Sequence, residues 1–277
     1  MIIDAHMHFS NVAAFYTAAD DSGVVYSQKG YIEECKRAKI IASVCMGLNE
    51  SKPHAFPDEN ATVPMLADLD EPPPDMYTCI GINPHRLDDD AIKRIQQTIN
   101  KSIVGFKIYA GYYHFHVHDP VYDPIYRLAA EHGLTVAIHT GVTYSETGLM
   151  EYSHPLQADR AAVMYRDAKI LLCHMGNPWI MDACEVAYKN RNVYLDISGL
   201  VEGNSGHIQE TMDNPLLMAH YSVGLHYLNN YTKVLFGTDW PIVPLEAYIE
   251  FCRKLVPDKH HARVFYENAR ELYRLGV

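Results

Sequence analysis

The sequence lacks the features that would indicate a membrane or an oxidising compartment. No apolar run is long enough to span a bilayer, and no basic segment precedes a long apolar stretch near the start, as a signal peptide would require. None of the six cysteines forms a C-x-x-C pair, and Cys45, Cys79 and Cys173 lie in apolar, strand-like runs. We therefore expect buried free thiols, a cytoplasmic location and no membrane partner.

Positive charge is also scarce. The chain has 23 Lys and Arg residues against 34 Asp and Glu residues, which gives a formal net charge of -11 with histidine neutral. Proteins that bind nucleic acid need basic patches against the phosphates, so we expect no nucleic-acid partner. Hydrophobic residues make up 48% of the 277 residues, which is typical of a globular protein long enough for one barrel.

Short apolar runs alternate with helical patterns along the whole sequence. Most of these apolar runs are not interrupted by polar residues, as expected of strands buried on both faces of a parallel sheet. The predicted strands are Ile2–Phe9, Ile40–Met46, Tyr77–Ile82, Ile103–Tyr109, Leu134–His139, Lys169–His174, Val193–Ile197 and Val234–Asp239. No linker marks a second domain, so the pattern predicts an α/β fold with a single (β/α)₈ TIM barrel over residues 1–277.

The segments between the strands carry helix caps and helix breakers. Acidic residues favour a helix N-terminus, and glycine favours the position after a helix C-terminus. We expect a polar loop from the first strand through Tyr26, and a long connection over Glu50–Met76 with room for a helical turn in Asn60–Leu69. The expected helices are Gly30–Lys39, one after Asp88–Asp90, Asp123–Gly133, Ser153 to about Asp167, Trp179–Asn190, an irregular Gly203–Thr232, Leu245–Leu255 and Asp258–Leu275.

Two histidines, His6 and His8, lie two residues apart on the first predicted strand. Side chains at this spacing point to the same side of a strand, so the two imidazoles could bind one metal ion. An isolated H-x-H motif also occurs on ordinary strands. However, other polar residues end the predicted strands four, five, six and eight, at the face where TIM barrels carry active sites. These residues, Lys107, His139, His174 and Asp239, turn the motif into a predicted metal site.

The motifs around these residues resemble those of the amidohydrolase superfamily, and most closely its amidohydrolase-related (Amidohydrolase 2) branch of metal-dependent hydrolases and non-oxidative decarboxylases. The resemblance covers nearly the whole chain and is specific for the superfamily, but not for the substrate, which loops select. The motifs read Ile-Asp-Ala-His-Met-His-Phe, Val-Ala-Ile-His-Thr-Gly, Leu-Cys-His-Met-Gly and Leu-Phe-Gly-Thr-Asp-Trp-Pro, on strands one, five, six and eight.

The resemblance implies a role for each residue. The metal ligands would be His6, His8, His139 and Asp239, and the ion would be divalent, with zinc the first choice. Asp239 would also be a catalytic residue that takes the proton from the water activated by the metal. His174 would be either a ligand of a second metal or a catalytic group that polarises the substrate.

Lys107 has two interpretations. In binuclear members of the superfamily, a lysine on strand four is carboxylated and bridges two metal ions, and Lys107 lies on the matching strand. Alternatively, Lys107 remains an amine that binds an anionic substrate, which we favour because the surrounding motifs resemble those of mononuclear members. TatD-type nucleases share the H-x-H start, but they have a glutamate where this chain has Lys107.

Further residues are candidates for contacts with the substrate. Tyr109 and His116 belong to a segment rich in tyrosine and histidine after strand four, and loops on this face carry specificity. A surface loop is an equally good interpretation of that segment. Arg86 could bind a carboxylate through two hydrogen bonds, or it could simply face solvent. The predicted substrate-binding residues are Lys107, Tyr109, Arg86 and His116.

Taken together, these observations predict a metal-dependent hydrolase that cleaves a C–N or C–O bond in a small, anionic molecule. A non-oxidative decarboxylase of an unsaturated or aromatic carboxylic acid and a lactonase are the alternatives among enzymes. A catalytically silent binding barrel is the alternative of another class, although the complete set of His and Asp residues argues against it. The expected partners are a small-molecule substrate and one or two divalent metal ions, with a homodimer left open.

Overall fold

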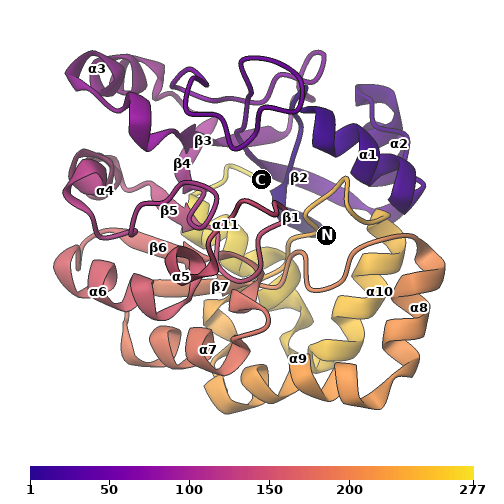
Figure 1. Ribbon diagram of the computed structural model, residues 1–277. Coiled ribbons are helices and arrows are strands. Elements are labelled where there is room, and N and C mark those ends of the chain that lie inside the picture. The colour runs from indigo at the N-terminus through magenta and orange to yellow at the C-terminus, as the bar shows by residue number, and fades with distance from the viewer.

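Eight parallel strands form one sheet in the order β1 to β8 in the computed structural model, which describes residues 1–277. Helices surround this sheet (Figure 1). The strands are β1 Ile2–Met7, β2 Ile40–Met46, β3 Met76–Ile82, β4 Ile103–Ile108, β5 Thr135–Ile138, β6 Lys169–Leu172, β7 Val193–Asp196 and β8 Val234–Leu235. The predicted (β/α)₈ TIM barrel is therefore confirmed.

The barrel closes through the backbone that follows the short strand β8. The amide of Ala5 donates to the carbonyl of Phe236 (3.0 Å), and the amide of His8 donates to the carbonyl of Trp240 (2.7 Å). The amide of Thr238 donates to the carbonyl of His6 (3.1 Å). These bonds bring the end of the chain's last strand directly beside the first strand, although more than two hundred residues separate them in the sequence.

The α-helices mostly occupy the predicted segments between the strands. Asp88 begins one of them as predicted, because its side chain accepts a hydrogen bond from the amide of Ala91. Gly133 ends another in the left-handed conformation. The helices are α1 Ala13–Ser22, α2 Gln28–Ala38, α3 Asp89–Thr98, α4 Asp123–His132, α5 Met150–Ser153, α6 Leu156–Met164, α7 Ile180–Lys189, α8 Ser205–Asp213, α9 Pro215–Leu228, α10 Leu245–Leu255 and α11 Asn268–Tyr273.

Several predicted boundaries were wrong. Helix α1 replaces part of the expected polar loop; its N-cap side chain forms no hydrogen bond, and the helix is anchored by buried alanines. Asn60–Leu69 contains no helix, and Met65 instead pairs with Gly81 of β3. The helix expected from Ser153 is present as α6, which begins at Leu156, and the short α5 before it was not predicted. His154 separates the two helices, since a proline disfavours helical geometry in the residue before it.

Two predicted strands end early because their last residues leave extended geometry. After β6, Cys173–Gly176 form a turn of 3₁₀-helix in which His174 has a φ of 61°. After β8, Asp239 has a φ of 65°. Positive φ is uncommon for residues other than glycine and is often found at functional sites. The backbone therefore departs from the regular pattern where two of the predicted site residues lie.

The lumen of the barrel is apolar at its N-terminal end. A cluster of buried side chains joins strands around the whole barrel to α11, including Ala42, Ala137, Leu171 and Leu272. Lys169, the first residue of β6, donates a hydrogen bond to the carbonyl of Leu272 (2.9 Å), and Figure 1 shows α11 behind the strands near the barrel centre. Helix α11 thus plugs the N-terminal end, which leaves the opposite end for a cavity.

The cysteines predicted to be buried free thiols are confirmed as such. All six are free thiols, and Cys45, Cys79 and Cys173 are buried. No helix combines the length and the apolar character needed to cross a membrane.

Candidate functional site

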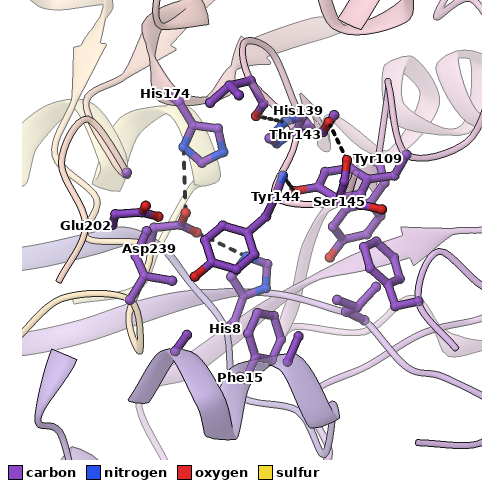
Figure 2. Close-up of a pocket in the computed structure, with 18 of the residues that line it drawn as sticks. His8, Phe15, Tyr109, His139, Thr143, Tyr144, Ser145, His174, Glu202 and Asp239 are labelled. Carbon is purple, nitrogen blue, oxygen red and sulfur yellow. Dashed lines mark hydrogen bonds and ion pairs between the residues drawn. The ribbon is translucent and has the colours of Figure 1, made fainter. Parts of the chain in front are cut away.

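A cavity of about 540 Å³ lies at the C-terminal ends of the strands (Figure 2). One part of its wall is aromatic and is formed by Phe15, Phe56, Tyr109, Tyr112 and Tyr144. The titratable side chains in the wall are His8, Lys107, Tyr109, Tyr112, His139, Tyr144, His174, Glu202 and Asp239. The structure therefore brings most of the predicted site residues to one cavity at the expected face of the barrel.

Three histidines lie around the carboxylate of Asp239. Its Oδ1 atom is 3.2 Å from Nε2 of His6 and 3.1 Å from Nε2 of His8. Its Oδ2 atom lies 3.9 Å from Nδ1 of His174 (Figure 2). Residues from the first, sixth and eighth strands thus meet at one carboxylate.

The other ring nitrogens of His6 and His8 are held by acceptors. Nδ1 of His6 lies 2.9 Å from Oδ2 of Asp196, and Nδ1 of His8 lies 3.1 Å from the carbonyl oxygen of Met46. An acceptor at Nδ1 fixes the proton on that nitrogen and leaves the lone pair of Nε2 free. Both Nε2 atoms then point at Asp239, and once each has lost its proton the arrangement suits a cation shared by all three side chains.

Burial and neighbouring charges set the protonation of these groups. Burial raises the pKa of Asp239, but His174 and His6 outweigh it and hold that pKa well below its usual range. Burial lowers the pKa of His8, and it lowers that of His174 to about 4. Burial and the nearby Lys107 both lower the pKa of His6, but the neighbouring carboxylates of Asp196 and Asp239 outweigh them, so this pKa is raised.

The donor set fits a divalent metal ion. Nε2 of His6 and Oδ1 of Asp239 are buried, and they have no polar partner outside their contacts with each other and with Nε2 of His8. Together with His8, these residues offer ligand atoms within 4.8 Å of one another. Imidazole nitrogen and carboxylate oxygen are the ligands that zinc and similar ions prefer. A cation would give these two buried atoms a partner beyond the cluster itself.

His139 and His174 line the same cavity but have other partners. Nε2 of His139 lies 3.0 Å from the carbonyl oxygen of Val142, and its ring centre is 4.9 Å from that of His174. Nδ1 of His174 lies 3.1 Å from the carbonyl oxygen of Ser198. His139 is thus outside the set of converging ligand atoms, whereas Nε2 of His174 forms no hydrogen bond with the protein.

Lys107 and Tyr109 lie in the cavity wall. Figure 2 shows Tyr109 on the side opposite Glu202. The ammonium of Lys107 is buried and donates to Sγ of Cys173 (3.0 Å). The hydroxyl of Tyr109 donates to the carbonyl of Gly47 (2.7 Å). Lys107 is the only Lys or Arg in the wall, and it forms no salt bridge, its amine being bonded to Cys173 instead.

Arg86 and His116 are not in the cavity wall. The exposed guanidinium of Arg86 donates to the carbonyl of Glu59 (3.0 Å). The ring of His116 packs against Tyr152, with ring centres 4.7 Å apart. The sequence offered no way to determine which loop residues turn toward the cavity, because loop paths depend on contacts with distant segments.

Sequence reasoning missed two carboxylates behind the site. Asp196 ends β7 and is buried, and the amide of His174 donates to its Oδ1 atom (2.9 Å). Asp4 accepts hydrogen bonds from the amide of Thr238 (2.9 Å) and from its hydroxyl (2.6 Å), and burial raises the pKa of Asp4 to about 7. The criterion that selected Asp239, a polar residue at a strand end, would also have selected Asp196.

The backbone leaves room for this cluster. Gly199 has a φ of 57°, and a Cβ atom there would lie 2.8 Å from both Oδ2 of Asp239 and Nδ1 of His174. The turn after β8 is capped by Thr238, whose hydroxyl accepts a hydrogen bond from the amide of Trp240 (3.0 Å). The carboxylate of Asp239 is therefore free of a capping role and faces the histidines.

Solved structures of several proteins are similar to this chain in fold. A probable 2-pyrone-4,6-dicarboxylic acid hydrolase from Acinetobacter baumannii has a TM-score of 0.65 at 12% identity, over 99% of each chain. A 5-carboxyvanillate decarboxylase from Sphingomonas paucimobilis has a TM-score of 0.60 at 14% identity, over 99% of each chain. An amidohydrolase from Burkholderia multivorans with bound zinc has a TM-score of 0.64 at 13% identity, also over 99% of each chain. At these identities the likeness extends to the fold alone.

A comparison at the level of sequence is more specific. Among curated proteins, none matches this sequence significantly. The sequence model of a family of enzymes described as Amidohydrolase, however, matches residues 3–275, which include every residue of the cluster around Asp239. The chain therefore belongs to this amidohydrolase family, within the TIM-barrel amidohydrolase superfamily.

Proposed function

We propose that this protein is a metal-dependent hydrolase that cleaves a C–N or C–O bond in a small, anionic molecule. The observation that carries the proposal is the convergence of His6 and His8 on the ionised carboxylate of Asp239, with two buried ligand atoms that have no other partner. A bound divalent metal lowers the pKa of water toward neutrality and polarises a carbonyl group. Zinc is the proposed ion, as in the related Burkholderia structure.

The proposed ligands are His6, His8 and Asp239, with His139 as the fourth. His139 lines the same cavity, and a single carbonyl oxygen, that of Val142, lies against its Nε2 atom. Asp196 would keep the ring of His6 in place through the 2.9 Å contact at Nδ1. Such partners behind a ligand orient it and commonly contribute 10- to 100-fold, roughly, to metal affinity.

The chain's own groups would then handle the proton and the substrate. Asp239 is the proposed proton acceptor, because its low pKa keeps the carboxylate ionised at neutral pH. His174 lines the cavity with Nδ1 engaged by Ser198, so Nε2 is available to a polar group of the substrate. The buried ammonium of Lys107 would offset a negative charge on the substrate.

A non-oxidative decarboxylase is the second candidate, and one observation favours it. The wall of the cavity presents five aromatic side chains, which suit a flat ring or a conjugated acid. A similar fold carries the decarboxylation of 5-carboxyvanillate in the Sphingomonas enzyme. In that reaction Lys107 and the metal site would hold the carboxylate that is lost.

One assay separates the two candidates. The zinc-loaded protein would be incubated with a panel of small amides, lactones, and aromatic or unsaturated carboxylic acids. Release of a new carboxylic acid together with an amine or alcohol supports the hydrolase. Release of CO₂ without any product of hydrolysis supports the decarboxylase and contradicts the hydrolase. A fully loaded protein that converts no member of the panel beyond the protein-free rate counts against both.

A further inference from the structure

Three tyrosines line the cavity, and their hydroxyl groups have different partners. Tyr109 donates its hydroxyl proton to the carbonyl of Gly47 (2.7 Å). Tyr144 is 61% exposed, so its hydroxyl is open to water. Tyr112 is partly buried, and the only hydrogen bond of its hydroxyl is one that it accepts, from the backbone amide of Tyr144 (2.9 Å). Tyr112 therefore keeps a hydroxyl proton in the cavity wall that no protein group accepts.

The contact with Tyr144 fixes the direction of that proton. A phenol oxygen carries one proton and also lone pairs that accept hydrogen bonds, and its O–H bond prefers the plane of the ring. Because the amide of Tyr144 occupies one side of the oxygen, the O–H bond of Tyr112 points to the other side. The ring is also held in place, since its centre lies 5.0 Å from that of Phe56 and 4.9 Å from that of His139. The hydroxyl is thus a positioned donor.

The same hydroxyl stays protonated at neutral pH. Burial raises the pKa of Tyr112 above its usual range, and the carboxylates of Asp239 and Glu202 raise it further. Both carboxylates line the cavity, and neither accepts a hydrogen bond from this hydroxyl. The proton of Tyr112 therefore remains available to a molecule bound in the cavity.

Tyr112 lies on the part of the wall that carries Lys107. The ammonium of Lys107 is 5.5 Å from the centre of the Tyr109 ring, and that centre is 6.3 Å from the ring centre of Tyr112. An ammonium and a phenol hydroxyl are both donors, and the hydrogen bonds that they form are strongest when the acceptor is ionised. This part of the wall therefore suits a carboxylate better than a neutral carbonyl group.

A purely structural role would use only the oxygen of Tyr112. The bond from Tyr144 ties the loop after β5 to the segment after β4, and it needs the lone pair of the phenol rather than the proton. We propose that Tyr112 is a specificity-determining residue whose hydroxyl donates a hydrogen bond to a carboxylate of the substrate, separate from the group held at the metal site. The substrate is then an acid whose carboxylate lies away from the bond that is cleaved. That this acid is a substrate rests on the proposed function, whereas its binding does not.

The test compares the zinc-loaded parent with Tyr112→Phe by titration calorimetry. The probes are the three benzenedicarboxylates, which differ in the spacing of their two carboxylates, and benzoate, which has one. The parent should bind the best dicarboxylate at least about tenfold more tightly than benzoate, because a hydrogen bond to a charged group contributes about 10- to 100-fold. In Tyr112→Phe this preference should fall about tenfold or more, while the affinity for benzoate should change little.

Tyr113→Phe is the matched control. Tyr113 follows Tyr112 in the chain but lies outside the cavity wall, and its hydroxyl donates to the carbonyl of Asp58 (3.1 Å). This variant should keep the parental preference for the dicarboxylate. Zinc content is measured in both variants and should equal that of the parent, since phenylalanine at position 112 keeps the ring contact with His139.

Two results with Tyr112→Phe would overturn the proposal. One is an unchanged preference for the dicarboxylate, and the other is equal weakening of both kinds of probe, which would indicate that the variant has only lost the loop contact at Tyr144. A parent that does not prefer two carboxylates to one overturns it as well. None of these measurements needs turnover. A protein that shows the expected preference but hydrolyses no member of the substrate panel would contradict the proposed hydrolase and leave the assignment of Tyr112 standing.

Discussion

Both sides of the cavity carry histidines, but one side pairs them with carboxylates and the other places one near a lysine. On the first side, His6 and His8 face the carboxylate of Asp239, and Asp196 lies behind His6. We call these four residues the carboxylate side. On the second side, Lys107 donates to the thiol of Cys173, and His139 lies against a backbone carbonyl. We call these three residues the lysine side.

The difference separates two kinds of chemistry within one cavity. The carboxylate side concentrates negative charge and imidazole nitrogens, which favour a cation. The lysine side contains a buried ammonium without any carboxylate partner, which favours an anion. We therefore expect substitutions on the carboxylate side to affect metal binding and turnover, and substitutions of Lys107 to affect substrate affinity.

Asp239→Asn should have the largest effect. Asparagine keeps the size of the side chain and tolerates the positive φ at this position, but it cannot accept a proton. We expect kcat to fall about 10²- to 10⁴-fold on the substrate identified by the panel, with the melting temperature close to that of the parent. Turnover close to the parental value would show that Asp239 is not the proton acceptor.

His8→Ala should mainly remove the metal. Loss of one of the converging ligands should leave less than about a tenth of an equivalent of zinc after dialysis, by elemental analysis. His139→Ala is the informative comparison, because His139 lies on the lysine side and its Nε2 atom is already engaged. As the proposed fourth ligand, it should lower the zinc content less than His8→Ala does. A larger loss of zinc in His139→Ala than in His8→Ala would show that the lysine side contributes more to metal binding than the carboxylate side does.

Asp196→Asn should weaken the metal site without touching the metal. The amide still reaches Nδ1 of His6, but it lacks the charge that favours the imidazole orientation. We expect zinc affinity to fall about 10- to 100-fold in competition with a chelator. Cys184→Ser is the control, because Cys184 is a buried thiol of α7 that lies outside the cavity wall, and it should leave zinc affinity unchanged. Equal losses in the two variants would show that the effect is general destabilisation of the barrel.

Lys107→Met should change substrate binding rather than metal content. Methionine fills a similar volume in the buried position but carries no charge. We expect one equivalent of zinc to remain and KM to rise about tenfold, with a smaller change in kcat. A parent protein that binds two metal ions, with the added mass of CO₂ under native conditions, would contradict the unmodified amine and favour a carboxylated Lys107.

Arg86→Ala should have the smallest effect. The guanidinium of Arg86 donates to the carbonyl of Glu59 and does not line the cavity. We expect kcat/KM to change less than about twofold, as is usual for an exposed residue outside the site. A tenfold rise in KM would restore Arg86 as a substrate contact and would mean that its loop moves over the cavity when the substrate binds.

The fold could be predicted from the sequence to a large extent. The strands β2 to β7 bury both faces, so their continuous apolar runs mark them without any tertiary information. Helix α1 could not be predicted, because its N-cap forms no side-chain hydrogen bond and its alanines become buried only when the helix packs against the barrel. The ends of β6 and β8 were also placed too late, since the turns at His174 and Asp239 depend on hydrogen bonds to neighbouring strands.

What the sequence determined by itself is the barrel and the chemistry at its rim. Alternation of apolar and helical segments requires parallel strands, and parallel strands bring their C-terminal residues to one end. The tertiary structure alone decided which of those residues meet. Closure of β1 against the segment after β8 brings His6 and His8 to Asp239, and the buried Asp196 then orients His6. These contacts join residues 190 or more positions apart, and no local pattern specifies a distance across a barrel.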